Sequence, residues 1–222
     1  MIRRSLTPLL ALATACLVFA GCESVSHTDS ARTGPFFTPA NTRGVDRLPA
    51  TIRRIALLPV AGLSTIPESS LARLDESFLA ELNRTARAES LLVSRDLLAR
   101  LAGSRQLFST DVLPHDLFTK LAGATQADAV LFVDLTAYSP YPPLKLGIRA
   151  KLVDIRSGEM LWNFDNLFDT NEPSVVNAAR KHYLDSNPSS GGKGDLSSTV
   201  LQNPTRFGTY VASATFVTLP RR

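Results

Sequence analysis

The order of hydrophobic and polar residues along the chain predicts alternating strands and helices from about residue 51 onward. Residues 52–60 become continuously apolar, which is typical of a strand in the middle of a sheet. Residues 127–138 form a second such strand. Between them, apolar residues recur at the spacing of an amphipathic helix: Leu71, Leu74, Phe78 and Leu82. This order predicts an α/β domain, with a central mixed β-sheet and flanking helices.

Local signals place the remaining elements of the domain. They are a short strand at 90–93 and helices that begin near Glu68, Ser94, Pro114, Pro173 and Pro204. Residues Thr65–Glu68 have the pattern of a capping box, and Ser94 and Asn203 are residue types that cap helices. The last helix is expected to end near Pro220, and a strand over 215–219 is the alternative.

Residues 144–169 predict an antiparallel hairpin, because apolar and polar residues alternate on both sides of a turn. A two-residue turn would place Lys151 opposite Phe164 and mix the two faces. A three-residue loop over 156–158, with Gly158 in the left-handed conformation, keeps the faces separate. The pairs that it predicts are Arg149 with Asp165, Lys145 with Asp169, Leu152 with Trp162 and Leu146 with Phe168. Met160, Trp162 and Phe164 are expected on the core face.

Residues 1–21 have the layout of a secretory signal peptide, with two arginines near the start and an apolar stretch over 9–20. The ending Val18-Phe-Ala-Gly-Cys22 resembles the bacterial lipobox, with phenylalanine where leucine is usual. The resemblance implies cleavage before Cys22 and acyl chains on that cysteine. Glu23, in place of aspartate, then implies sorting to the outer membrane on its periplasmic face. An ordinary signal peptide is the alternative.

Residues 22–50 are rich in Ser, Thr, Pro and Gly and have no hydrophobic period, so they predict a flexible tether. Phe36 and Phe37 are its one apolar spot, and we expect them to dock on the domain; a motif that binds a partner is the alternative. The domain itself is expected over 51–220, with a flexible insertion over 185–198 that is rich in Gly and Ser.

Cleavage changes the charge and the chemistry of the working protein. Two of the 24 basic residues, Arg3 and Arg4, leave with the signal, so the formal charge falls from +4 to +2. Cys16 leaves as well and Cys22 is acylated, which leaves no free thiol. No metal site, cofactor motif or catalytic group is predicted. Nucleic-acid binding is not expected either, because no basic block is interleaved with aromatic residues.

Asp134 is the most suggestive acidic residue, because it lies within an apolar strand. We favour the interpretation that it accepts backbone hydrogen bonds or marks the point where the strand emerges; a functional carboxylate is the alternative. His115 and His182 have no second histidine at ligand spacing and are expected on helix surfaces. The Ser190-x-x-Lys193 pattern lies in the Gly/Ser insertion and is interpreted as chance.

Tyr138 and Tyr141 are the candidate residues for contact with a partner. They lie in the segment Tyr-Ser-Pro-Tyr-Pro-Pro, in which prolines limit the entropy lost when a partner orders the loop. The alternative is a wide strand connection whose rings cover the edge of the sheet.

The order of elements, with Gly123-Ala-Thr-Gln-Ala-Asp-Ala-Val-Leu-Phe-Val133 and Val153-Asp-Ile-Arg-Ser-Gly-Glu-Met-Leu-Trp162, is similar to a group of bacterial envelope proteins. The group includes the CsgG-type lipoproteins of curli secretion, LpoB-type activators of peptidoglycan synthases, PelC-type exopolysaccharide lipoproteins and the TolB N-terminal domain. The resemblance implies a lipid-tethered α/β domain that acts by contact with other envelope proteins or by forming a homo-oligomer, and it carries no catalytic residues.

These observations predict a non-enzymatic outer-membrane lipoprotein that binds or assembles envelope proteins. A subunit of a secretion or exopolysaccharide-export ring is one alternative, and a lipid-anchored envelope enzyme is another.

Overall fold

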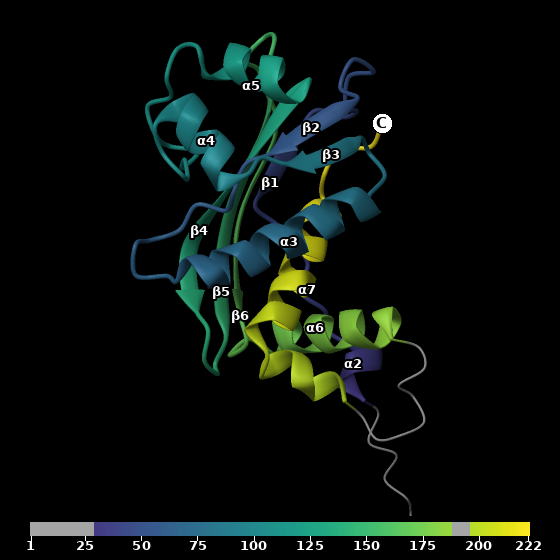
Figure 1. The fold of residues 1–222 in the computed structure, drawn as a ribbon. Coiled ribbons are helices and arrows are strands. Elements are labelled where there is room, and N and C mark those ends of the chain that lie inside the picture. Colours follow the sequence, from purple (N-terminus) through teal and green to yellow (C-terminus); the bar gives the residue numbers. More distant parts are fainter. Residues whose placement is uncertain (1–28, 188–195) are drawn as a thin grey trace, which may run out of the picture.

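The computed structural model describes residues 29–187 and 196–222 (Figure 1). Its sheet has six strands in the order β1-β6-β5-β4-β2-β3. The strands are β1 (Thr42–Gly44), β2 (Arg54–Leu57), β3 (Glu89–Leu92), β4 (Ala129–Ser139), β5 (Lys145–Asp154) and β6 (Met160–Asp169). Strand β2 pairs in parallel with β3 and β4, while β4, β5, β6 and β1 pair antiparallel. The mixed sheet of the predicted α/β class is therefore confirmed.

Helices cover the sheet on both faces and create two cores. The helices are α2 (Ser30–Thr33), α3 (Glu68–Arg84), α4 (Arg95–Ala102), α5 (Leu117–Thr125), α6 (Pro173–Ser186) and α7 (Pro204–Phe216), with the 3-10 helix η2 at Ser197–Leu201. Helices α3, α6 and α7 bury apolar side chains against one face of the sheet. Helices α4 and α5 bury theirs against the other face, at the end where β2 and β3 lie. No helix among the described residues has the length and apolar character needed to cross a membrane.

Helix starts follow the predictions in part. Ser94 caps α4, since its Oγ accepts a hydrogen bond of 3.1 Å from the Leu97 N–H. Asn203 caps α7 through bonds from the next two N–H groups. The capping box predicted at Thr65–Glu68 is wrong: Pro67 occupies the cap position of α3 and no side chain bonds to the helix start. The chain end forms a helix to Phe216, so the alternative of a strand over 215–219 is also wrong.

The hairpin of β5 and β6 has the predicted register. Lys145 lies opposite Asp169 and Arg149 opposite Asp165, and Gly158 has φ +71° in the turn. The register shifts by one residue after Leu152, however, so that Val153 lies opposite Met160. The placement of Met160 in the core is therefore wrong, and its side chain is 53% exposed. The alternation of residue types contains no sign of this shift.

Residues 29–50 pack on the domain, which corrects the flexible tether predicted for them. Strand β1 pairs with β6, and the Phe37 ring lies 5.1 Å from the Phe168 ring, as the docking prediction required. Asp29 forms an ion pair of 3.0 Å with Arg180 on α6. Composition could not reveal this, because the segment is held by backbone pairing, two rings and isolated side chains such as Leu48, which form no periodic pattern. The rest of the predicted tether, with Cys22, and the signal segment 1–21 lie outside the described residues.

The structure describes both ends of the predicted insertion at 185–198, and at each end helical structure extends into it. Residues 185 and 186 complete α6, and residues 197 and 198 begin η2. Ser190 and Lys193 lie outside the described residues.

Candidate functional site

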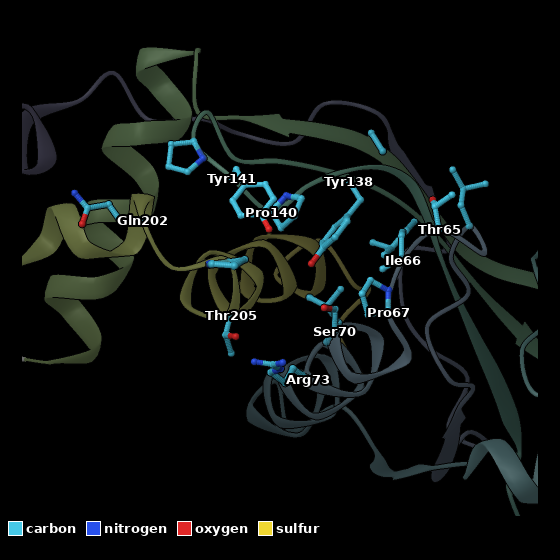
Figure 2. A pocket seen from close by; sticks show the side chains of 16 residues that line it. Thr65, Ile66, Pro67, Ser70, Arg73, Tyr138, Pro140, Tyr141, Gln202 and Thr205 are labelled. Carbon is cyan, nitrogen blue, oxygen red and sulfur yellow. The ribbon is translucent and has the colours of Figure 1, made fainter.

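A cleft of about 700 Å³ is the candidate site, and the predicted contact residues line it (Figure 2). Tyr138, Pro140 and Tyr141 come from the end of β4 and the loop that follows it. The opposite wall is formed by the segment before α3, with Ile66 and Pro67, and by the first two turns of that helix. The start of α7 completes the cleft. Three segments far apart in the sequence therefore meet here.

A β-bulge in β4 directs Tyr138 into the cleft. Leu135 lies opposite Ile148, but Ala137 lies opposite Gly147, so Thr136 is an extra residue in the ladder. One extra residue moves every later side chain to the other face of a strand. Tyr138 consequently lies opposite Leu146 and packs against the core under α3, α6 and α7. Asp134 lies on the other face of the sheet.

Gly147 makes room for this bulge. A Cβ atom built on Gly147 would overlap Thr136 Oγ1 and lie 2.9 Å from the Ala137 nitrogen. A glycine inside a strand is a known sign of a bulge. It is therefore the sequence signal from which the position of Tyr138 could have been predicted.

The loop presents Tyr141 to solvent with limited freedom. Its side chain is 78% exposed, and Figure 2 shows it on the opposite side of the cleft from Ile66 and Pro67. Ser139 Oγ donates a hydrogen bond of 3.1 Å to the Tyr141 carbonyl, and prolines on both sides fix the backbone. An amphipathic ring held in this way can contact a partner at a small cost in conformational entropy.

The groups in the cleft are suited to binding. The described residues that line it include no carboxylate, histidine or cysteine, and Arg73 is the one charged residue among them. The Arg73 guanidinium donates to the Ser69 carbonyl at 3.2 Å and is exposed. The Gln202 amide, hydroxyl groups of serine, threonine and tyrosine, and apolar side chains form the rest of the lining. This set supplies apolar contact and hydrogen bonds, with no acid–base pair at hand.

Asp134 lies outside the cleft, and its oxygens are occupied. Its side chain is 2% exposed and accepts hydrogen bonds from the Ser109 N–H at 2.9 Å and from Ser109 Oγ at 2.7 Å. Lys151 Nζ donates to the Ser109 carbonyl at 3.0 Å. Burial raises the pKa of the Asp134 carboxyl, and the hydrogen bonds from Ser109 oppose that rise. The prediction that Asp134 accepts a backbone hydrogen bond is confirmed, and the bonds fasten the α4–α5 connection to the sheet.

A second buried acid, Asp75, was not singled out from the sequence. Its carboxylate accepts from the Val60 N–H at 2.6 Å and pairs with Arg95 at 2.8 Å, which joins α3, α4 and the segment after β2. Burial raises its pKa, against the lowering effect of the Val60 hydrogen bond and Arg95. Its position four residues after Leu71 on the apolar helix face is the signal that could have found it.

The two histidines of the domain are not part of the cleft. His115 is exposed in the turn before α5, so its predicted place on a helix surface is wrong. His182 lies on α6 with its ring 6.0 Å from that of Tyr210, and burial lowers its pKa. Among the described residues, no group of three His, Cys, Asp or Glu side chains is placed to hold a metal ion.

Comparisons with known proteins returned solved structures only. No protein-family model matches the chain, and no curated protein matches it. Matches include the PelC dodecamer from Paraburkholderia phytofirmans (12% identity, TM-score 0.48, 82% of this chain and 97% of that chain). Lipoprotein GNA1162 from Neisseria meningitidis has 16% identity and a TM-score of 0.40, over 63% of this chain and 99% of that chain. The LpoB C-terminal domain from Salmonella enterica has 12% identity and a TM-score of 0.35, over 61% and 87%.

The names of these similar structures are those of bacterial envelope proteins. PelC and LpoB belong to the group that the order of elements in the sequence resembles.

Proposed function

We propose that this chain is a non-enzymatic lipoprotein of the outer membrane, on its periplasmic face, and that it binds an envelope protein through the cleft of Tyr138 and Tyr141. The composition of the cleft carries the proposal. A stiff loop offers an exposed tyrosine beside apolar side chains and hydroxyl groups, and its lining holds no group suited to proton transfer. Aromatic residues of this kind are enriched where proteins bind one another.

A photo-reactive phenylalanine analogue in place of Tyr141, introduced into the full chain in cells, tests the cleft. The expected result is a crosslinked product with one envelope protein, which disappears when Ile66→Asp is added on the opposite wall. The matched control carries the analogue at Val112, which is 99% exposed and does not line the cleft. Products that are the same at both positions would contradict the proposed cleft.

Cys22→Ser tests the lipid anchor separately. The unaltered chain should incorporate a radioactive fatty acid and float with membranes, and the Cys22→Ser chain should do neither. Equal retention of both chains on membranes would contradict the anchor while leaving the cleft open to the crosslinking test.

A further inference from the structure

We infer that the end of the domain formed by α2 and α6 lies against the lipid bilayer, and that the end formed by α4 and α5 points away from it. The inference rests on the proposed lipid at Cys22. It adds to that proposal an orientation, a membrane-facing surface and a condition on the partner.

The chain is fixed to the domain from Asp29 onward. Asp29 pairs with Arg180 on α6, and Ala31 of α2 is 1% exposed. The following segment is held as well: Asn177 Nδ2 donates to the Pro35 carbonyl at 3.1 Å, and the Phe37 N–H donates to the Ser174 carbonyl at 3.0 Å. A pull on residue 29 is thus transmitted directly to α6.

Little chain remains between this attachment and the lipid. Only six residues separate Cys22 from Asp29. No conformation of these residues can place the two Cα atoms more than about 25 Å apart, because an extended chain rises by at most about 3.6 Å per residue. The 28 residues between Cys22 and the predicted start of the domain at residue 51 would have allowed about 100 Å. The domain is therefore held at one end, and the distance from that end to the lipid is smaller than the length of the domain along its long strands.

The fold decides which surface this is. The segment after α2 contacts Phe168 at one end of β6, whereas the hairpin turn at Ser157 lies beyond the other end. The ten residues of β6 separate these ends by about 33 Å. Figure 1 shows α2 and α6 at one end of the molecule and α4 and α5 at the opposite end. Arg32 on α2 is exposed at the end we assign to the bilayer, where a cation can face lipid phosphates. Lys181 on α6 is exposed at the same end, and its ammonium group pairs with Asp185 at 2.7 Å.

The cleft belongs to the same end. Its loop joins β4 to β5, and the Thr170 N–H just after β6 donates to the Leu144 carbonyl at 2.9 Å. A partner segment seated beside Tyr141 is thereby brought near the membrane. The partner that fits this surface is one whose binding segment lies close to the bilayer, as in a second membrane-anchored protein.

Single fluorescent labels on the acylated full chain test the orientation. The mature chain has no cysteine except the acylated Cys22, so Thr33→Cys and Ser157→Cys each provide one reactive thiol at an exposed position. The labelled lipoproteins are reconstituted into vesicles of phosphatidylethanolamine and phosphatidylglycerol that carry a trace of acceptor dye on the headgroups. Energy transfer to the acceptor is then measured for both positions.

We expect at least twofold more efficient transfer from position 33 than from position 157, and we expect a flexible insert of 20 residues after Glu23 to remove most of that difference. Equal transfer from both positions, on protein that floats with the vesicles, would overturn the orientation alone. Protein that fails to float would overturn the proposed anchor, and the orientation with it. Urea unfolding of each labelled chain verifies that the domain is folded.

Discussion

At the scale of single residues, the path of β4 depends on a missing side chain at Gly147. A methyl group there would collide with Thr136 and with the Ala137 backbone, so Gly147→Ala should lower the free energy of unfolding by about 1–3 kcal/mol. The control is Gly123→Ala in α5, where a Cβ meets nothing within 4 Å. This substitution should raise the free energy of unfolding by up to about 1 kcal/mol, because alanine is favoured over glycine inside a helix. Urea unfolding measures both. Equal stability of the two variants would show that β4 can bulge without this glycine.

Asp134 is expected to act in stability. Asp134→Asn leaves one acceptor oxygen for the two Ser109 donors and turns an amide N–H₂ toward the same region, which should cost about 1–3 kcal/mol in the free energy of unfolding. Glu159→Gln, an exposed carboxyl on the hairpin turn, is the control and should change stability by less than about 0.5 kcal/mol. Unchanged stability of Asp134→Asn would contradict this role and revive the alternative of a functional carboxylate.

The raised pKa of Asp134 also fixes how its effect depends on pH. Burial raises the pKa in the folded state above the ordinary value of 3.8, so the folded state binds the proton more tightly than the unfolded state. The part of its stabilising effect that depends on the bound proton is complete below pH 3.8 and is lost as pH rises through the folded-state pKa, while the hydrogen bonds from Ser109 remain. The difference in unfolding free energy between the unaltered chain and Asp134→Asn should therefore narrow as pH rises. A difference that widens would show that the ionised form is the one the fold stabilises.

At the scale of elements, the hairpin shows what charge pairs do for a sheet. Lys145 lies 2.8 Å from Asp169 and lowers the pKa of that carboxyl through its hydrogen bond. Lys145→Ala should cost about 0.2–1 kcal/mol at neutral pH. Since a lowered pKa gives stability that is lost as pH falls below the ordinary value of 3.8, the cost should vanish in acid. Thermal unfolding at neutral and acidic pH measures it, and the same cost at both would mean that Lys145 acts by packing alone.

The ion pair between α3 and α4 works differently, because it is buried. Arg95→Leu leaves the Asp75 carboxylate inside the protein without its cation, and we expect a loss of about 3–5 kcal/mol. Arg105 provides the matched control: it bridges Glu68 and Asp96 with its side chain 52% exposed, and Arg105→Leu should cost far less stability than Arg95→Leu. Similar losses in urea unfolding would contradict the view that burial decides the value of these pairs.

Elements that are determined by residues close together in the sequence could be predicted from it. Features that depend on residues far apart in the sequence could not. The hairpin register followed from charges that face one another, and the amphipathic helix from its spacing. The bulges at Thr136 and after Leu152 each add one residue to a ladder, which leaves residue types unchanged while it reverses faces. Of the cleft, only the loop with Tyr138 and Tyr141 could be predicted from the sequence. Its other walls come from segments about 60 residues away along the chain on either side.

At the scale of the whole molecule, the same reasoning explains the misplaced domain boundary. A stretch of Ser, Thr, Pro and Gly has the composition of a linker, yet short backbone pairings, two rings and the buried side chain of Leu48 fix it on the surface of the domain. Residues 29–50 are ordered because the domain supplies the groups that they contact. The hydrophobic pattern within these residues therefore contains little information about their structure.

Two truncations test where the domain begins. Removal of residues 1–28 should leave the free energy of unfolding unchanged within about 0.5 kcal/mol of a full-length Cys22→Ser chain, because Asp29 and the contacts of the segment that follows it are all kept. Removal of residues 1–50, the boundary predicted from composition, deletes β1 and uncovers Phe168. It also removes Leu48, a side chain that is 4% exposed and is worth about 2–5 kcal/mol in such a place. The longer deletion should therefore unfold at a markedly lower urea concentration. Coincident urea transitions for the two truncated chains would restore the long flexible tether, and with it the freedom of the domain to leave the membrane surface.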